Sequence, residues 1–377
     1  MDLRDLLKFI PKMSSDEEFR ILGPSDTSSQ NPQDNLHRRL SSGSTLKSVY
    51  IESHSSSPHS SSVQSDLNLI AKARLQQRSK PINLNLLVLG DSNIGKTSFI
   101  NTILIKYFRL INLKPKNPPK PTRQFLSNKA VISNSDLELR VNLIDTPGFG
   151  FFSNREKWIK TVSEYVFDQA SDYKKIKKTT EKSQLEDKRI HLALYFIEGP
   201  RCKESDLSIL FKLQKFVNIL PVLAKADGYS QTEIFEVKLG ILTQCIDAEI
   251  QFFDVVTAEE VIRELGNSEL GTVPPFAIIS AGRLVEFSAK IKFFREYPWG
   301  VCDIHDKHCS DFKLLCKLLF GYLVIPIIES AKKLNRENLR KLKSANKKVK
   351  EKEQQACKAR KLKWLSKFAS KLILHLL

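Results

Sequence analysis

The sequence predicts a three-layer α/β domain with a mostly parallel sheet, a disordered N-terminal tail and a basic, helical C-terminal tail. Short apolar runs alternate with helical patterns from residue 82 onward, and the first run leads directly into a glycine-rich loop. Ser-rich residues 14–65 lack apolar periodicity, and Lys and Arg gather beyond residue 329. We therefore predict three regions, with the boundaries 1–79, 80–328 and 329–377.

Composition narrows the class of protein. The 377 residues are 41% hydrophobic and 27% charged, which suits one large core with appendages and excludes a collagen-like chain. Six cysteines without close pairs indicate reduced thiols in the cytosol rather than a disulfide framework, and no secretory signal is expected, because no apolar stretch follows Met1. The net charge of +18 predicts an acidic partner: phosphate, nucleic acid or anionic membrane.

Five apolar runs are the predicted strands: Leu84 to Leu89, Leu139 to Ile144, His191 to Ile197, Ile219 to Leu223 and Phe276 to Ile279. Helical spacing from Asp206 to Phe216 predicts a crossover helix between the third and fourth. The longest apolar run, Leu314 to Ile328, is shorter than the roughly 20 residues of a spanning helix, so a buried core helix is favoured over a membrane span.

A phosphate-binding loop follows the first strand. Its sequence is Gly90-Asp91-Ser92-Asn93-Ile94-Gly95-Lys96-Thr97, with Ser98 next in line. This is the G-x-x-x-x-G-K-[ST] pattern between a strand and a helix, where backbone N–H groups cradle phosphates at a helix N-terminus. We expect Lys96 to reach the β- and γ-phosphates and the Thr97 hydroxyl to bind Mg²⁺.

A second motif, Asp145-Thr146-Pro147-Gly148, ends the second predicted strand. In that position Asp145 can hold the metal through water, and the Gly148 amide can sense the γ-phosphate. Phe149 follows, where small signalling GTPases carry a water-orienting Gln. Whether the protein is an enzyme stays open, and any hydrolysis of GTP to GDP is expected to be slow.

The third motif, Ala224-Lys225-Ala226-Asp227, ends the fourth predicted strand. A carboxylate at Asp227 can accept two N–H bonds from guanine and would be left unpaired against adenine. Lys225 would lie along the base and the phosphate loop. The order of the three motifs predicts GTP or GDP as the ligand.

From residue 82 to 320 the chain resembles the septins. The resemblance is carried by Asp145-Thr146-Pro147-Gly148-Phe149-Gly150, Leu194-Tyr195-Phe196-Ile197, Pro275-Phe276-Ala277-Ile278-Ile279, Arg295-Glu296-Tyr297-Pro298-Trp299-Gly300-Val301, His308-Cys309 and Asp311-Phe312. It implies a GTP- and GDP-binding cytoskeletal subunit, of the kind that acts in cell division, which assembles with other septin subunits or with itself into oligomers and filaments. It also implies a membrane-associated scaffold or diffusion barrier.

The resemblance also assigns roles to single residues. Thr122 falls at the switch I threonine of catalytically competent septins, where it would serve Mg²⁺ and hydrolysis, and Arg295 falls where the family places an arginine against guanine. Ser280, after the last strand, stands where the family has Gly and joins the nucleotide-binding set. The alternative function is a monomeric or dimeric membrane-associated switch GTPase of the Toc or immune-associated kind, without filaments.

Several residues depart from the family pattern. Gly199-Pro200-Arg201-Cys202-Lys203 replaces the Gly-His-Gly-type loop that reaches across the nucleotide interface between subunits, and Phe151 replaces an Asp. These departures put the partner contact across that interface in doubt. The cluster Cys302, His305, His308, Cys309 and Cys316 raises the alternative of zinc, but its spacing lacks a clean C-x-x-C pair set and His308-Cys309 belongs to the family segment, so no zinc is expected.

The positive charge is concentrated in the C-terminal tail. Residues 329–371 hold sixteen Lys and Arg against four Glu, and apolar heptads fail after about two repeats, which disfavours a conventional coiled coil. Residues 361–377 instead read as a basic amphipathic helix with Trp364 and Phe368 on the apolar side, which favours an anionic membrane over docking to protein. No nucleic acid is expected, because no known module accompanies the charge. The predicted location is cytoplasmic and cytoskeletal, peripheral at membranes.

Overall fold

The computed structural model describes residues 81–108, 122–133, 138–151, 154–179, 186–255, 274–280, 283–287, 290–298, 300–338 and 340–341. The predictions for the tail 1–79 and for the amphipathic segment 361–377 lie outside these residues.

A six-stranded sheet forms the centre of the fold, in the order β2-β3-β1-β4-β5-β6. Its strands are β1 (Ile82–Gly90), β2 (Leu126–Ser133), β3 (Glu138–Asp145), β4 (Leu192–Glu198), β5 (Ile219–Ala224) and β6 (Phe276–Ile278). Strands β3, β1, β4, β5 and β6 run parallel, and β2 pairs antiparallel with β3. The mostly parallel sheet is therefore present, with all five predicted strands in it.

Burial explains which strands the sequence revealed. Strands β1, β4 and β5 are covered on both faces and are almost continuously buried, which requires the unbroken apolar runs seen in the sequence. Strand β2 lies at the edge of the sheet, and half the residues in its sequence, LSNKAVIS, are polar. Its weak apolar pattern explains why it was not predicted.

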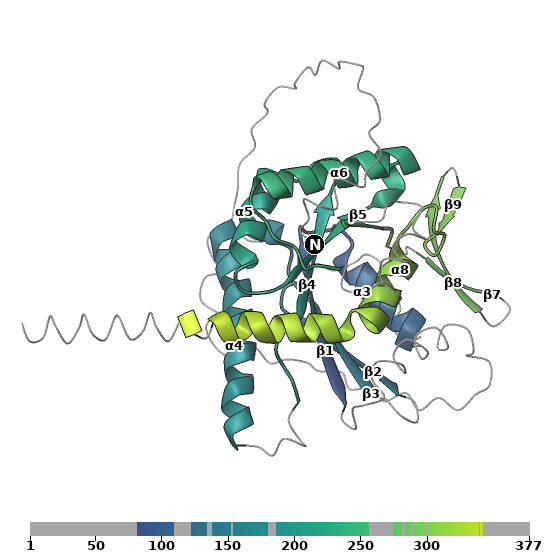
Figure 1. The fold of residues 1–377 in the computed structure, drawn as a ribbon. Helices are drawn as coiled ribbons and strands as arrows, with labels where there is room; N and C mark the ends of the chain where they lie inside the picture. Colours follow the sequence, from purple (N-terminus) through teal and green to yellow (C-terminus); the bar gives the residue numbers. More distant parts are fainter. Residues whose placement is uncertain are drawn as a thin grey trace, which may run out of the picture. The chain divides into compact units, whose positions relative to one another are not determined.

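Helices cover both faces of the sheet (Figure 1). Helices α4 (Arg155–Thr179) and α5 (Glu204–Leu213) pack together on one side, and α3 (Lys96–Phe108) and α8 (Phe312–Lys317) lie on the other. Helix α6 (Gln231–Asp247) begins at a capping box, in which the Ser230 hydroxyl accepts from the Glu233 N–H and the Glu233 carboxylate accepts from the Ser230 N–H. The predicted crossover helix 206–216 corresponds to α5.

A second sheet of three antiparallel strands follows the first. It consists of β7 (Arg283–Phe287), β8 (Lys290–Tyr297) and β9 (Gly300–Asp303), with β8 in the middle. Figure 1 shows it beyond α8, at the side of the molecule opposite α4. The sequence did not predict this sheet.

The long apolar run folds as core helix. Helix α8, the π-helical turn η4 (Leu318–Tyr322) and the helix Val324–Asn338 bury their apolar side chains, and the predicted boundary at residue 328 falls within the last of them. Across the described part of the chain no single helix meets the length and hydropathy needed to cross a membrane. Among the described helices, the pair Phe312–Tyr322 and Val324–Asn338 alone meets the length and hydropathy criteria jointly, and this pair is bent by 69°.

A buried ion pair fixes α8 against the sheet. The Lys238 ammonium on α6 lies 2.7 Å from Oδ2 of Asp311, and that same oxygen accepts the Ala277 N–H of β6 at 2.8 Å. Both charged side chains are almost fully buried. Because removing one partner would leave the other charge buried and uncompensated, this pair holds α6, β6 and α8 in one arrangement.

Candidate functional site

The three predicted motifs meet at one edge of the main sheet. Strand register places Asp145 beside Val88, Gly90 beside Phe196, and Glu198 beside Ala224. Because the strands are parallel, the loops that leave their carboxyl ends lie together at this edge, where open α/β sheets bind ligands.

The phosphate loop Gly90–Thr97 turns through conformations that few side chains adopt. Asn93 has φ 58° and Gly95 has φ 103°. The positive φ favours glycine at this position, and a Cβ atom on Gly95 would also lie 2.8 Å from the Ser280 hydroxyl oxygen. Ile94 is buried in the core, whereas Ser92, Asn93, Thr97 and Ser98 are exposed at the start of α3.

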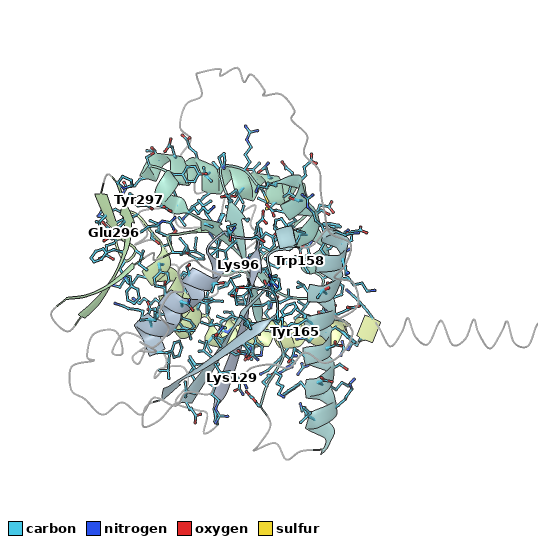
Figure 2. The ribbon with its side chains drawn as sticks, turned by 180° about the vertical axis from the view of Figure 1, so that it is seen from behind. Lys96, Lys129, Trp158, Tyr165, Glu296 and Tyr297 are labelled. Atoms are coloured by element: carbon cyan, nitrogen blue, oxygen red, sulfur yellow. The ribbon has the colours of Figure 1, made fainter. Side chains whose placement is uncertain are left out.

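Lys96 folds back over this loop. Its ammonium donates to the Asp91 carbonyl at 2.6 Å and the Gly90 carbonyl at 3.2 Å, and the residue is only 6% exposed. Burial lowers the pKa of Lys96 to about 8, with the nearby carboxylates of Asp145 and Asp91 opposing the shift. The cation is thus held at the helix N-terminus, where phosphate groups are favoured. Figure 2 labels Lys96 at the middle of the molecule.

Three oxygen-bearing side chains converge at the predicted metal position. The Thr97 and Thr122 hydroxyls donate to Oδ2 of Asp145 at 2.6 and 3.0 Å and lie 3.2 Å from each other. Oδ1 of Asp145 is buried without a hydrogen-bond partner, and burial raises the pKa of this carboxyl although both threonines and Lys96 oppose it. Two hydroxyls and an under-satisfied carboxylate are an oxygen donor set that fits Mg²⁺.

The loop after Asp145 packs directly on the phosphate loop. The Thr146 hydroxyl donates to the Val88 carbonyl at 2.7 Å, and the Trp158 indole donates to the Pro147 carbonyl at 2.9 Å. A Cβ atom on Gly148 would lie 2.4 Å from the Ser92 nitrogen. Only glycine allows this approach, which brings the Gly148 backbone to the loop that would hold the phosphates.

The base motif forms a tight turn at the other end of the site. Lys225 has φ 55°, and the 3-10 turn η3 (Ala226–Gly228) follows it. The Asp227 side chain is 10% exposed; its Oδ2 accepts from the Tyr297 hydroxyl and lies 3.3 Å from Arg295 Nε, while its Oδ1 is buried without a partner. A buried, partly unpaired carboxylate is suited to select a ligand that donates N–H groups.

Ser280 and Arg295 connect the base end to the phosphate loop. The Ser280 hydroxyl donates to the Gly95 carbonyl at 3.2 Å, and Arg295 Nη1 donates to the Ser280 carbonyl at 3.5 Å. A polar chain therefore runs from Gly95 through Ser280 and Arg295 to Asp227. All sixteen residues predicted for the site lie among the described residues and gather at this edge; their roles toward nucleotide and metal stay predictions.

Three residues in the site were not predicted from sequence. Glu198, at the end of β4, accepts from Lys225 Nζ at 2.6 Å, and the expected position of Lys225 along the base and the phosphate loop stays a prediction. Lys203 Nζ lies 3.6 Å from Glu198 and 3.9 Å from Asp91, and Lys225 lowers the pKa of Glu198. Tyr297 is the third, and its spacing two residues after Arg295 on one strand was the signal that could have revealed it.

Comparison with known proteins covers most of the chain. The family model described as Septin matches residues 80–354. The chain is 33% identical over 256 residues to Septin homolog spn5 of Schizosaccharomyces pombe, which covers 67% of this chain and 51% of that protein. It is 30% identical over 244 residues to Septin-8-A of Danio rerio, which covers 61% of this chain and 55% of that protein. The chain thus spans about half the length of the curated relatives it matches.

A solved structure shares the fold. The septin GTPase domain from Chlamydomonas reinhardtii superimposes with a TM-score of 0.59 at 21% sequence identity, and the match covers 69% of this chain and 99% of that chain. At this identity the likeness concerns the fold alone. Together with the sheet order, it confirms the predicted three-layer α/β fold with a mostly parallel sheet.

Proposed function

The chain belongs to the septin family, and from that premise we propose that it is a guanine-nucleotide-binding cytoskeletal subunit that assembles into oligomers or filaments. The observation that carries the nucleotide part is the pair of buried carboxylate oxygens without partners, Asp145 Oδ1 and Asp227 Oδ1, at the two ends of one site. Buried acceptors of this kind cost free energy unless a ligand satisfies them. GTP or GDP with Mg²⁺ supplies a cation for the first and N–H donors for the second.

Each part of the site has a role in this proposal. Lys96 binds the β- and γ-phosphates, while backbone N–H groups of Gly90–Thr97 cradle them. Thr97, Thr122 and Asp145 hold Mg²⁺, which neutralises developing charge during phosphoryl transfer. Lys225 lies against the base, Asp227 selects guanine, and Arg295 and Ser280 support that end of the site.

Hydrolysis in this proposal is slow. The position after Gly148 holds Phe149, a buried residue that packs against Trp158 with ring centroids 5.9 Å apart. A buried phenylalanine has no group that can orient an attacking water, so Thr122 is the only residue of the proposed site to which we assign a catalytic role. Single-turnover measurement of GTP hydrolysis by wild type and Thr122→Ala tests this: the variant should be slower, and an equal rate would remove Thr122 from the reaction.

The metal assignment can be tested through binding. Asp145→Asn removes the charge that would hold Mg²⁺, so we expect GTP affinity to lose its dependence on added magnesium. The ligand-free variant should be at least as stable as wild type at pH 7, because burial disfavours the Asp145 carboxylate. Titrations with GTP in the presence of Mg²⁺ and of EDTA measure the magnesium dependence of the affinity, and thermal unfolding measures the stability. A magnesium dependence equal to that of wild type would contradict the assignment.

Assembly follows from family membership and is tested directly. Nucleotide bound at a subunit interface stabilises the oligomer by its own binding free energy. Sedimentation and negative-stain microscopy at low salt, with GTP and with GDP, should show rods or larger oligomers. Exchange between monomer and dimer only would contradict the filament proposal.

One observation favours the alternative of a solitary or dimeric switch GTPase. In the loop Gly199–Lys203, the Lys203 ammonium lies 3.6 Å from Glu198 and 3.9 Å from Asp91 of its own chain. A lysine that is paired within its own chain is less available to a neighbouring subunit. The same sedimentation experiment separates the two functions.

The tail supplies a further part of the proposal. We expect residues 361–377, which lie outside the described residues, to bind anionic membranes, because Lys363, Lys367 and Lys371 accompany an apolar stripe. After deletion of 361–377, the protein should no longer float with phosphatidylserine vesicles. Changing the three lysines to Gln keeps the apolar stripe and should weaken binding mainly at low salt; undiminished flotation of the deletion variant would refute the membrane role.

A further inference from the structure

Strand β8 delivers two side chains to one carboxylate. Arg295 and Tyr297 are two residues apart on β8, so they project from the same face of the second sheet. Both meet Oδ2 of Asp227, which belongs to the main domain: the Tyr297 hydroxyl donates to it, and Arg295 Nε lies 3.3 Å away. Figure 2 labels Tyr297 on this second sheet, to one side of Lys96.

With these two contacts in place, the Asp227 carboxylate can still accept further hydrogen bonds. An ionised carboxylate offers about four acceptor positions on its two oxygens. Tyr297 and Arg295 occupy Oδ2, while Oδ1 is buried and has no partner. Any ligand that donates neighbouring N–H groups must therefore meet a carboxylate whose rotation is already fixed from the opposite side.

We propose that Tyr297 is a positioning residue for base recognition: its hydroxyl holds Oδ2 of Asp227 and thereby sets Oδ1 for the N–H donors of guanine. The inference rests on the proposed function, in which Asp227 reads the base.

The tyrosine provides something that Arg295 alone does not. Arg295 divides its contacts, since Nη1 also donates to the Ser280 carbonyl at 3.5 Å and the guanidinium lies 5.8 Å from the Tyr297 ring centroid. A hydroxyl donates one directed bond without adding charge, so it orients the carboxylate and leaves its negative charge intact. Burial and the contact with Asp227 raise the pKa of Tyr297 well above its usual range, which keeps the phenol protonated and able to donate.

The test is Tyr297→Phe, which removes the hydroxyl and keeps the ring. Loss of one hydrogen bond to a charged group should weaken GDP binding about tenfold. IDP has no 2-amino group and makes only part of the contact with Asp227, so the ratio of GDP to IDP affinity should fall severalfold. Calorimetric titration of both nucleotides measures the two quantities.

A matched control and a second variant separate positioning from folding. Tyr165→Phe removes a phenol on α4, where the ring stacks on Phe125 with centroids 4.3 Å apart, and should change neither affinity nor ratio. In an Asp227→Asn background the Tyr297→Phe change should no longer alter the ratio, because the tyrosine acts through that carboxylate. Thermal unfolding of each variant shows whether the fold is kept.

The outcomes distinguish two failures. If wild type binds GDP no more tightly than ADP, the proposed function itself is wrong. If wild type prefers GDP and Tyr297→Phe weakens GDP and IDP equally, the tyrosine is a structural residue of the second sheet and this inference is overturned, while the nucleotide assignment stands.

Discussion

The phosphate end and the base end of the site are built differently. At the phosphate end, Gly90–Thr97 and Asp145 come from the carboxyl ends of the neighbouring strands β1 and β3 of a single sheet. At the base end, Asp227 in the turn η3 after β5 meets Tyr297 of the second sheet, seventy residues later. In the proposed function, phosphate binding would thus depend on one strand-to-helix connection, whereas base recognition would depend on how β8 meets the turn that holds Asp227.

The electrostatic settings of the two ends also differ. Asp145 lies near the buried cation Lys96, and two neutral hydroxyls donate to it. Asp227 faces a partly exposed guanidinium and one phenol. The first end therefore suits the charges of a metal and phosphates, and the second suits the neutral, N–H-donating ring that we propose.

The largest effect should come from breaking the phosphate end. Lys96→Met removes the cation that would donate to two phosphates, and two charge-assisted hydrogen bonds together correspond to roughly a thousandfold in affinity. In equilibrium titrations the affinities for GTP and for GDP should both fall by about this factor. Adenine nucleotides should remain rejected, because Asp227 is untouched.

Lys129→Met is the matched control for this variant. Lys129 lies on strand β2, pairs with Glu186 at 2.7 Å and is not among the residues of the site. Its replacement should leave nucleotide affinity within twofold of wild type. Retention of tight GTP binding by Lys96→Met would show that the backbone cradle alone holds the phosphates.

Breaking the base end should have a smaller and more selective effect. Asp227→Asn converts an acceptor for N–H groups into a side chain that also donates, so GDP should weaken about fiftyfold through loss of hydrogen bonds to a charged group. XDP, whose ring carries an additional carbonyl acceptor, should bind the variant better than GDP. Competition titrations with GDP, XDP and ADP measure this reversal, and unchanged guanine preference would show that base selection resides elsewhere.

The contrast between the ends also explains what the sequence could predict. The phosphate loop is one contiguous segment, and the motifs that contain Asp145 and Asp227 each come at the end of an apolar run. The sequence pattern of an apolar run followed by a motif therefore identified all three motifs. The parallel strands were predictable because burial on both faces requires continuous apolar runs, such as Leu84 to Leu89.

The unpredicted parts depend on contacts between distant segments. Tyr297 meets Asp227 only because β8 lies beside the turn η3 that holds Asp227, and residues 283–303 do not by themselves specify that contact. Glu198 is placed by register, since it lies beside Ala224 and hence next to Lys225. Tertiary arrangement decides such pairs, and for Tyr297 the local signal is limited to its spacing two residues after Arg295.

A pH titration tests the phosphate end without mutation. Burial lowers the pKa of Lys96 to about 8. Above that pH the free protein loses the cation, so affinity for GDP should fall, by about tenfold between pH 7 and pH 9 if the bound lysine stays charged. Calorimetry in buffers of different ionisation enthalpy should detect proton uptake on binding in this range.

The stability of the ligand-free protein should instead rise with pH, whereas the affinity for GDP falls. The folded pKa of Lys96 lies below the unfolded value of 10.5, so the charged form is penalised by folding. That penalty is fully present below pH 8 and is lost as pH rises from 8 to 10.5, which favours the folded state across this window. Lys96→Met should abolish both trends, and their persistence in the variant would assign them to another group.

The smallest expected effect concerns the rim of the site. Glu198 and Lys225 are 39% and 43% exposed, and exposed ion pairs contribute about 0.2–1 kcal/mol, so Glu198→Gln should change GDP affinity no more than about fivefold. The ratio of GDP to IDP affinity should not change, because the pair does not touch Asp227. If this variant instead matched Asp227→Asn in size, base recognition would depend on Lys225 held by Glu198, and the second sheet would lose the role that distinguishes the two ends.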